Sequence, residues 1–140
     1  ILWEDGIQNT LKKIAKTSVE FLGFVPDEEL PELYRNAKAL LFPQEEDFGI
    51  TPLEAAASGV PTIAYGAGGA LETIQHGITG LFFDKQSTTS MASAMRTFET
   101  MQWDKQRIRA HAQTFSEKQF IHAMRNEVAQ QWGKGILKTI

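Results

Sequence analysis

Short apolar runs alternate along the chain with stretches in which apolar residues recur at helical spacing. The apolar runs predict buried strands at residues 19–24, 38–42, 62–65 and 80–83, and the end of a further strand at residues 1–3. Helices are expected at residues 8–16, 27–37, 51–58, 70–76, 88–101, 104–113 and 116–132. Fully apolar strands that alternate with helices are typical of a parallel sheet covered on both faces. The predicted fold class is therefore α/β, a doubly wound parallel sheet with a helical C-terminal end.

Three segments are predicted to meet at one edge of this sheet. In parallel α/β sheets, ligands bind beyond the carboxyl ends of the strands. Three segments fall at that edge: Phe24 with Val25, residues 43–49, and the glycine loop at residues 66–69. We therefore expect them to contribute to one ligand site.

The segment after the second of these strands combines two carboxylates with a helix start. Glu46 and Glu54 are separated by seven residues, and Thr51, Pro52 and Glu54 are predicted as the N-cap, first and third positions of a helix. A helix start offers free N–H groups and a positive dipole end, which suit a phosphate. Gly49 leaves room for a ligand to approach the backbone. Carboxylates on either side could hold sugar hydroxyls, so the layout suits a nucleotide-diphosphate-sugar.

Several motifs follow one another in a recognisable order. Residues 46–55 read EDFGITPLEA and residues 59–64 read GVPTIA; FLGFV with DEEL stands at 21–30, GGALETI with GITGL at 68–81, and Phe115-Ser116 precedes Phe120. This series resembles the E-x7-E block and its flanking segments in group 1 of the retaining glycosyltransferases with the GT-B fold. The resemblance implies the Rossmann-like, donor-binding half of such an enzyme, as a single domain over residues 1–140.

The resemblance also implies a role for each residue of these motifs. Glu46 would be the catalytic carboxylate, bonded to hydroxyls of the donor sugar, and Glu54 would accept from both ribose hydroxyls. The other expected donor-binding residues are Phe24 and Val25 beside the base, Phe48, Gly49 and Ile50 beside sugar and phosphate, Thr51 beside the phosphate, and Gly68 and Gly69 near the donor.

Each of these residues also has a purely structural interpretation. Glu54 could be only the capping-box partner of Thr51, and Phe48 could be a loop aromatic that closes part of the core. The glycine loop fails as a dinucleotide G-x-G-x-x-G motif because Leu71 occupies the third small position, and a tight turn into a helix explains it equally. Glu72 is either a first-turn dipole partner or a site residue.

Composition excludes several other classes of protein. The 140 residues carry a net charge of −3 and no basic stripe, which gives no support for nucleic-acid binding. There is no cysteine, hence no disulfide or thiolate chemistry. His76, His111 and His122 lack metal-ligand spacing, and the last two are expected to face solvent. With no apolar run near about 18 residues, we expect a cytoplasmic protein or, in the complete enzyme, one peripheral at the inner membrane face.

Parts of the family pattern are missing from this sequence. Trp3 stands where the family usually has glycine. The family's first donor-domain strand, its glycine-rich loop, the Arg/Lys pair that neutralises the diphosphate and the acceptor-binding domain have no counterpart. We therefore expect a donor domain truncated at its N-terminal side, inactive alone and capable of forming a homodimer through its uncovered surface.

The predicted function is transfer of a hexose, with retention, from a nucleotide diphosphate sugar to a glycan or lipid-linked acceptor. The motif variant resembles bacterial mannosyltransferases of polysaccharide assembly, which favours GDP-mannose as donor, with no cofactor and no obligatory metal. A non-catalytic nucleotide-sugar-binding module and a GT-B sugar epimerase are the alternatives. A flavodoxin-like signalling domain is disfavoured because the acidic residues are scattered rather than clustered at strand ends.

Overall fold

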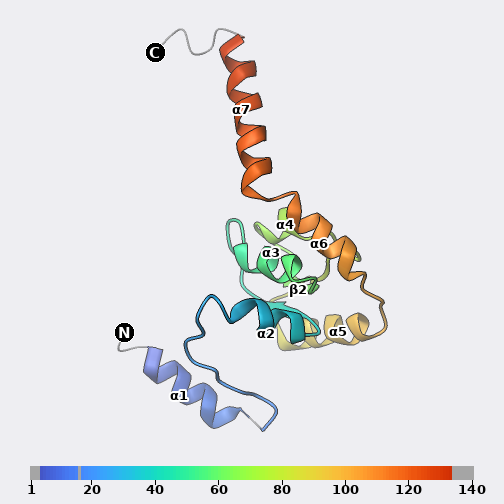
Figure 1. Ribbon diagram of the computed structural model, residues 1–140. Coiled ribbons are helices and arrows are strands. Elements are labelled where there is room, and N and C mark those ends of the chain that lie inside the picture. The colour runs from blue at the N-terminus through green and yellow to red at the C-terminus, as the bar shows by residue number, and fades with distance from the viewer. Residues whose placement is uncertain (1–3, 16, 134–140) are drawn as a thin grey trace. The chain divides into compact units, whose positions relative to one another are not determined.

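The computed structural model describes residues 4–15 and 17–133, in two compact units, Ile1–Leu30 and Pro31–Ile140 (Figure 1). In the first unit, helix α1 covers Glu4–Ile14, and Lys12 lies 5.8 Å from the centre of the Phe21 ring. The expected strand at residues 19–24 is wrong, because this segment forms no strand and its side chains are exposed. An apolar run becomes a strand only beside a partner strand. The strand end expected at residues 1–3 lies outside the described residues.

The second unit contains a three-stranded parallel sheet. Its strands are β1 (Leu40–Phe42), β2 (Thr62–Tyr65) and β3 (Gly80–Phe83), in the spatial order β1-β2-β3. Ile63 is in register with Leu41 on one side and with Leu81 on the other. The predicted parallel α/β fold is confirmed, although β1 begins two residues later than residues 38–42 suggested.

The sheet is covered on both faces, as the fully apolar strands indicated. Successive residues of β2 enter different core clusters, since side chains alternate between faces along a strand. Ala64 packs with Phe42 of β1 and Ala70 of α4, whereas Ile63 packs with Phe98 of α5. Helix α2 (Leu30–Asn36) begins at the last residue of the first unit. The other helices of the second unit are α3 (Ile50–Ala57), α4 (Ala70–Thr73), α5 (Thr88–Glu99), α6 (Lys105–Gln113) and α7 (Glu117–Gly133).

Helix α3 packs against β1, β2 and α6, and its C-terminal end is sharply defined. Gly59 has φ 80°, a left-handed conformation that favours glycine. Its N–H donates to the Ala56 carbonyl oxygen at 2.9 Å, and the N–H of Val60 donates to that of Ala55 at 2.9 Å. This pair of bonds is a Schellman motif, which confirms the expected stop of the helix at Gly59.

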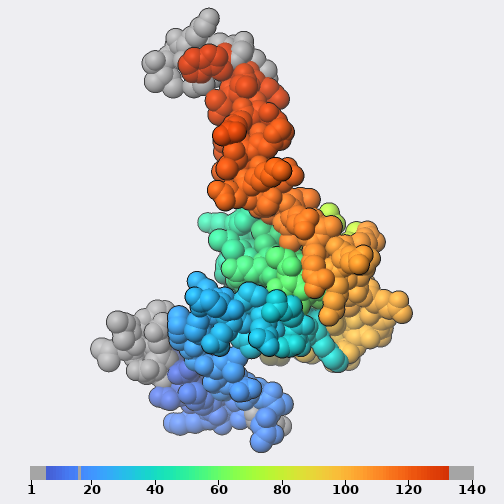
Figure 2. All heavy atoms as spheres, in the orientation of Figure 1, coloured from blue at the N-terminus to red at the C-terminus, as the bar shows by residue number. Residues whose placement is uncertain are grey.

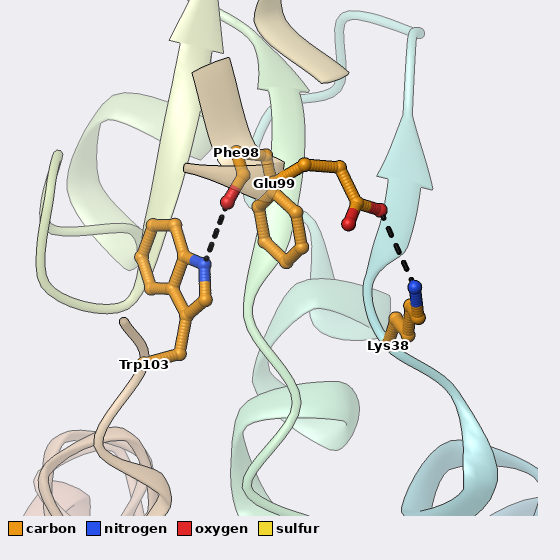
Figure 3. Close-up of polar contacts among 4 residues, drawn as sticks. All are labelled: Lys38, Phe98, Glu99 and Trp103. Carbon is orange, nitrogen blue, oxygen red and sulfur yellow. Dashed lines mark hydrogen bonds and ion pairs between the residues drawn. The ribbon is translucent and has the colours of Figure 1, made fainter. Parts of the chain in front are cut away.

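Two contacts lie at the C-terminal end of α5, one with the loop that follows it and one with the segment before β1. The Trp103 ring stacks on Phe98 with 4.9 Å between centroids, and its indole N–H donates to the Phe98 carbonyl oxygen at 3.4 Å. Figure 3 also shows Lys38 directed toward Glu99, with Nζ 3.6 Å from Oε1. This ion pair links α5 to the segment before β1; it is exposed and contributes at most about 1 kcal/mol. The stacked Phe98–Trp103 pair instead holds the loop after α5 against the end of that helix.

The last helix carries apolar residues that are exposed. Phe120, Met124, Val128 and Trp132 of α7 are 48–65% exposed. Within the described ranges, no helix has both the length and the apolar character needed to cross a membrane.

Candidate functional site

Two of the three segments expected at the carboxyl edge of the sheet come together there. The loop at residues 43–49 follows β1, and the glycine loop at residues 66–69 follows β2. The N–H of Gly69 donates to the Glu46 carbonyl oxygen at 2.7 Å. From the loop after β3, Gln86 donates through Nε2 to the Pro43 carbonyl oxygen at 3.0 Å. These bonds fix the main chain of the loop that carries Glu46.

The glycines of the second loop are required by close packing against the first. Gly68 has φ 56°, and a Cβ there would collide with the Glu46 carbonyl oxygen. At Gly69 a Cβ would collide with the Cα and carbonyl oxygen of Phe48. The N–H of Leu71 donates to the Gly68 carbonyl oxygen at 3.1 Å, closing a turn into α4. The tight-turn interpretation is therefore correct, and nearness of Gly68 and Gly69 to the donor stays a prediction.

Helix α3 begins earlier than the sequence suggested. Its N-cap is Gly49, in the left-handed conformation with φ 79° and ψ 76°. Thr51 and Pro52 are therefore the second and third helical residues, and Glu54 is the fifth, so the N-cap prediction for Thr51 is wrong. Glycine adopts a left-handed conformation without steric cost, which lets the helix start directly after it. Since no side chain in the described residues caps this end, Glu54 is not a capping-box partner.

This helix start has N–H groups available to an anion. The first N–H groups of an α-helix have no intrahelical acceptor, and Pro52 has no N–H. The amides without an intrahelical acceptor therefore belong to Gly49, Ile50 and Thr51. The Ile50 side chain is exposed and that of Thr51 is half-buried. The helix dipole adds a favourable potential for negative charge at the same point.

Both glutamates of the signature have exposed carboxylates. Gln44 donates through Nε2 to Oε1 of Glu46 at 3.2 Å, and the Tyr34 hydroxyl donates to Oε2 of Glu54 at 3.3 Å. No lysine or arginine in the described ranges forms an ion pair with either carboxylate. Most lone pairs of both groups thus remain free to accept hydrogen bonds from hydroxyls.

Phe48 belongs to a chain of contacts that ends at α4. Its ring, 45% exposed, meets Phe115 edge-on with 6.3 Å between centroids, and Phe115 meets His111 edge-on at 5.3 Å. His111 Nε2 lies 3.0 Å from the Thr73 carbonyl oxygen, which requires a proton on that nitrogen. His111 is half-buried, so the expectation that it faces solvent is wrong; His122 is exposed as expected. Phe48 therefore lies at the surface against Phe115, outside both core clusters, and its role beside the donor stays a prediction.

The remaining candidate residues lie outside the loops that follow β1 and β2. Phe24 is 90% exposed and Val25 half-buried, both in the first unit, so their role beside the base stays a prediction. Glu72 is exposed in the first turn of α4, which leaves both of its interpretations open. His76 accepts at Nδ1 from the N–H of Phe82 at 3.2 Å. In the part of the chain described, no three acidic or histidine side chains gather as metal ligands would.

Residues 5–115 match the family model for glycosyl transferases group 1. The chain belongs to this family. Mannosylfructose-phosphate synthase of Agrobacterium fabrum is 41% identical over 92 residues, 59% of this chain and 20% of that protein. The GDP-mannose-dependent alpha-(1-6)-phosphatidylinositol monomannoside mannosyltransferase of Mycobacterium tuberculosis is 39% identical over 99 residues, 61% of this chain and 26% of that protein.

Two solved structures have the same fold as this group 1 glycosyltransferase domain. Sucrose-phosphate synthase from Thermosynechococcus elongatus superimposes with a TM-score of 0.72 at 24% identity, over 92% of this chain and 34% of that one. Anabaena HepE in complex with UDP-glucose gives a TM-score of 0.63 at 24% identity, over 93% and 36%. The match confirms the predicted half of a GT-B fold. The chain spans about a fifth to a quarter of the length of the two curated relatives above.

Proposed function

We propose that this chain binds the nucleotide diphosphate sugar of a retaining hexosyltransferase. The complete enzyme would transfer mannose from GDP-mannose to a glycan or lipid-linked acceptor. One observation carries the proposal: the uncapped start of α3 lies in sequence between two exposed carboxylates, Glu46 and Glu54, that have no ion-pair partner in the described ranges. A nucleotide diphosphate sugar needs two kinds of group in its binding site: amides that donate to the phosphates, and carboxylates that accept from the hydroxyls.

Each part of the donor has a matching group on the chain. The diphosphate would accept from the N–H groups of Ile50 and Thr51 at the positive end of the helix. Glu54, one helical turn further on, would accept from the ribose hydroxyls, and Glu46 from hydroxyls of the transferred sugar. Gly49 has no side chain between them, and its backbone is buried against Phe42. The chain would hold the donor and orient it for reaction.

The identity of the donor rests on relatives. The Mycobacterium tuberculosis relative is GDP-mannose-dependent, which supports guanine and mannose. The Anabaena protein was solved with UDP-glucose, which supports a different base and sugar. We favour GDP-mannose because the first relative is closer in sequence. A direct comparison of nucleotides decides between the two.

Catalysis needs more than this helix start supplies. A helix N-terminus stabilises a developing negative charge by about 0.3–2 kcal/mol. Enzymatic rate enhancements correspond to at least about 8 kcal/mol. The 140 residues alone are therefore expected to bind donor and to transfer no sugar, and a radiolabelled transfer assay with GDP-mannose and UDP-glucose tests this. Net conversion of free nucleotide sugar would instead favour the epimerase.

Calorimetric titration tests the binding site. GDP, UDP, GDP-mannose and UDP-glucose are titrated into the wild type, into Glu54→Gln and into the matched control Glu45→Gln, which neutralises an exposed carboxylate of the same loop. We expect GDP-mannose to bind most tightly. Glu54→Gln should weaken it at least about tenfold, since hydrogen bonds to a charged group contribute about 1.5–3 kcal/mol, and Glu45→Gln should leave it unchanged. Equal affinities of both variants and the wild type would refute the proposed site.

A further inference from the structure

Tyr34 joins two helices that are separated in sequence by strand β1 and the loops on either side of it. It is the fifth residue of α2, and its hydroxyl donates to Oε2 of Glu54 on α3 at 3.3 Å. Figure 2 shows the atoms of α2, coloured blue to cyan, bordering the green atoms of α3. The distance exceeds the usual range for O–H···O bonds, about 2.5–3.0 Å, so the bond orients the carboxylate more than it immobilises it.

The tyrosine is suited to orient a carboxylate and leave its charge in place. The pKa of the Tyr34 hydroxyl is raised, first by its partial burial and then by the charge of Glu54 and the hydrogen bond to it. The hydroxyl is therefore a protonated, neutral donor throughout the physiological pH range. A lysine or arginine at this place would instead neutralise Glu54.

The bond leaves enough acceptor capacity for a pair of hydroxyls. A carboxylate has about four lone-pair sites, of which Tyr34 uses one on Oε2. Oε1 has no partner among the described residues. A carboxylate on an exposed surface otherwise rotates among several positions, and that freedom is lost when a ligand binds. A donor bonded to one oxygen restricts the rotation beforehand.

We propose that Tyr34 is a positioning residue for ribose: it orients the Glu54 carboxylate toward the 2′- and 3′-hydroxyls of the nucleotide. This inference rests on the proposed function, in which Glu54 accepts from the ribose. Tyr34 would then determine how much more tightly a ribonucleotide binds than a deoxyribonucleotide. It would have little effect on the binding of the diphosphate. Tyr34 touches the ligand only through Glu54.

The test compares ribonucleotide with deoxyribonucleotide binding in four versions of the chain. GDP and 2′-deoxy-GDP are titrated calorimetrically into the wild type, Tyr34→Phe, Glu54→Ala and the double variant. In the wild type, loss of the 2′-hydroxyl is expected to weaken binding about tenfold. In Tyr34→Phe this ratio should fall to about threefold, and in the Glu54→Ala background Tyr34→Phe should have no further effect.

A matched control is available in the other tyrosine of the chain. Tyr65, on β2, packs against Phe83 with 5.9 Å between centroids and 43° between the ring planes, and the hydroxyl bonded to Glu54 is that of Tyr34. Tyr65→Phe therefore removes a hydroxyl without removing the bond to Glu54. The ratio of GDP to 2′-deoxy-GDP affinity in Tyr65→Phe should equal that of the wild type. Tyr34→Leu serves for the same comparison if Tyr34→Phe does not show a native circular dichroism spectrum.

The outcomes separate this inference from the proposed function. If the folded Tyr34 variant keeps the wild-type ratio of GDP to 2′-deoxy-GDP affinity, the positioning role is overturned. The proposed function still stands in that case, provided that Glu54→Ala weakens GDP binding. Unchanged GDP binding in Glu54→Ala would overturn the proposed function and the positioning role together. A reduced ratio that disappears in the double variant supports both.

Discussion

Replacement of Gly69 by alanine perturbs the site through space alone. The backbone of Gly69 has φ −62°, which alanine adopts readily, so no conformational strain enters. The added Cβ would collide with Cα and the carbonyl oxygen of Phe48 and with the carbonyl oxygen of Asp47. These are backbone atoms, which cannot rotate away as the end of a side chain can. The loop must therefore move off the glycine turn.

The expected cost has two parts. Overpacking in a closely packed region costs about 1–3 kcal/mol. Separation of the loop also breaks the bond from the Gly69 N–H to the Glu46 carbonyl oxygen, 2.7 Å long, whose net contribution is about 0.5–1.5 kcal/mol. Together the free energy of unfolding should fall by about 2–4 kcal/mol. For a domain of this size that corresponds to a drop of roughly 8–14 °C in Tm.

Thermal unfolding followed by circular dichroism measures the effect. Gly6→Ala is the matched control, because Gly6 lies in α1 with nothing within 4 Å of an added Cβ. That variant should be as stable as the wild type or more stable by up to about 1 kcal/mol. A Gly69→Ala protein that melts within about 2 °C of the wild type would refute the packing argument.

Two further predictions concern helix α3 and Tyr34. Asp104 caps α6 by accepting from the N–H groups of Gln106 and Arg107, whereas Thr51 caps no helix. In denaturant unfolding, Asp104→Ala should therefore lower the free energy of unfolding by about 1 kcal/mol, and Thr51→Ala should change it by less than about 0.5 kcal/mol. Since the folded state raises the pKa of Tyr34 above 10.0, its contribution is fully present below that pH and is lost as pH rises further; urea titrations between pH 8 and 11 should show a steeper decline in the wild type than in Tyr34→Phe.

The sheet could be predicted because each of its strands leaves a local signal. Residues 62–65 and 80–83 are continuous apolar runs with breakers beside them, and the observed strands β2 and β3 have the same bounds. Residues 19–24 carry a similar signal and form no strand. Whether an apolar run pairs depends on the neighbours that it finds, and one sequence window does not contain that information.

The site was predictable to the extent that it is local. The loop after β1, the helix that follows and the glycine turn after β2 were each expected from short patterns, and the structure joins the two loops at Glu46 and Gly69. The helix start was misplaced because Thr-Pro is a strong local signal, and the left-handed glycine before it was stronger. Tyr34 and Glu54 are 20 residues apart in sequence, and His111 and Thr73 are 38 apart. No local spacing pattern predicts contacts between residues so far apart.

The two signature glutamates share one structural arrangement. The main chain of Glu46 is fixed by the bond from Gly69, and that of Glu54 by α3, while both carboxylates are exposed. Each carboxylate also accepts one bond from a neutral side chain, Gln44 or Tyr34. Ligand binding between them would therefore order little backbone, and the cost of ordering two flexible side chains, up to about 2 kcal/mol each, is partly met before the ligand arrives. Preorganisation of this kind increases the affinity for a ligand. Because the orienting side chains are neutral, both carboxylates also keep the negative charge that strengthens their hydrogen bonds with ligand hydroxyls.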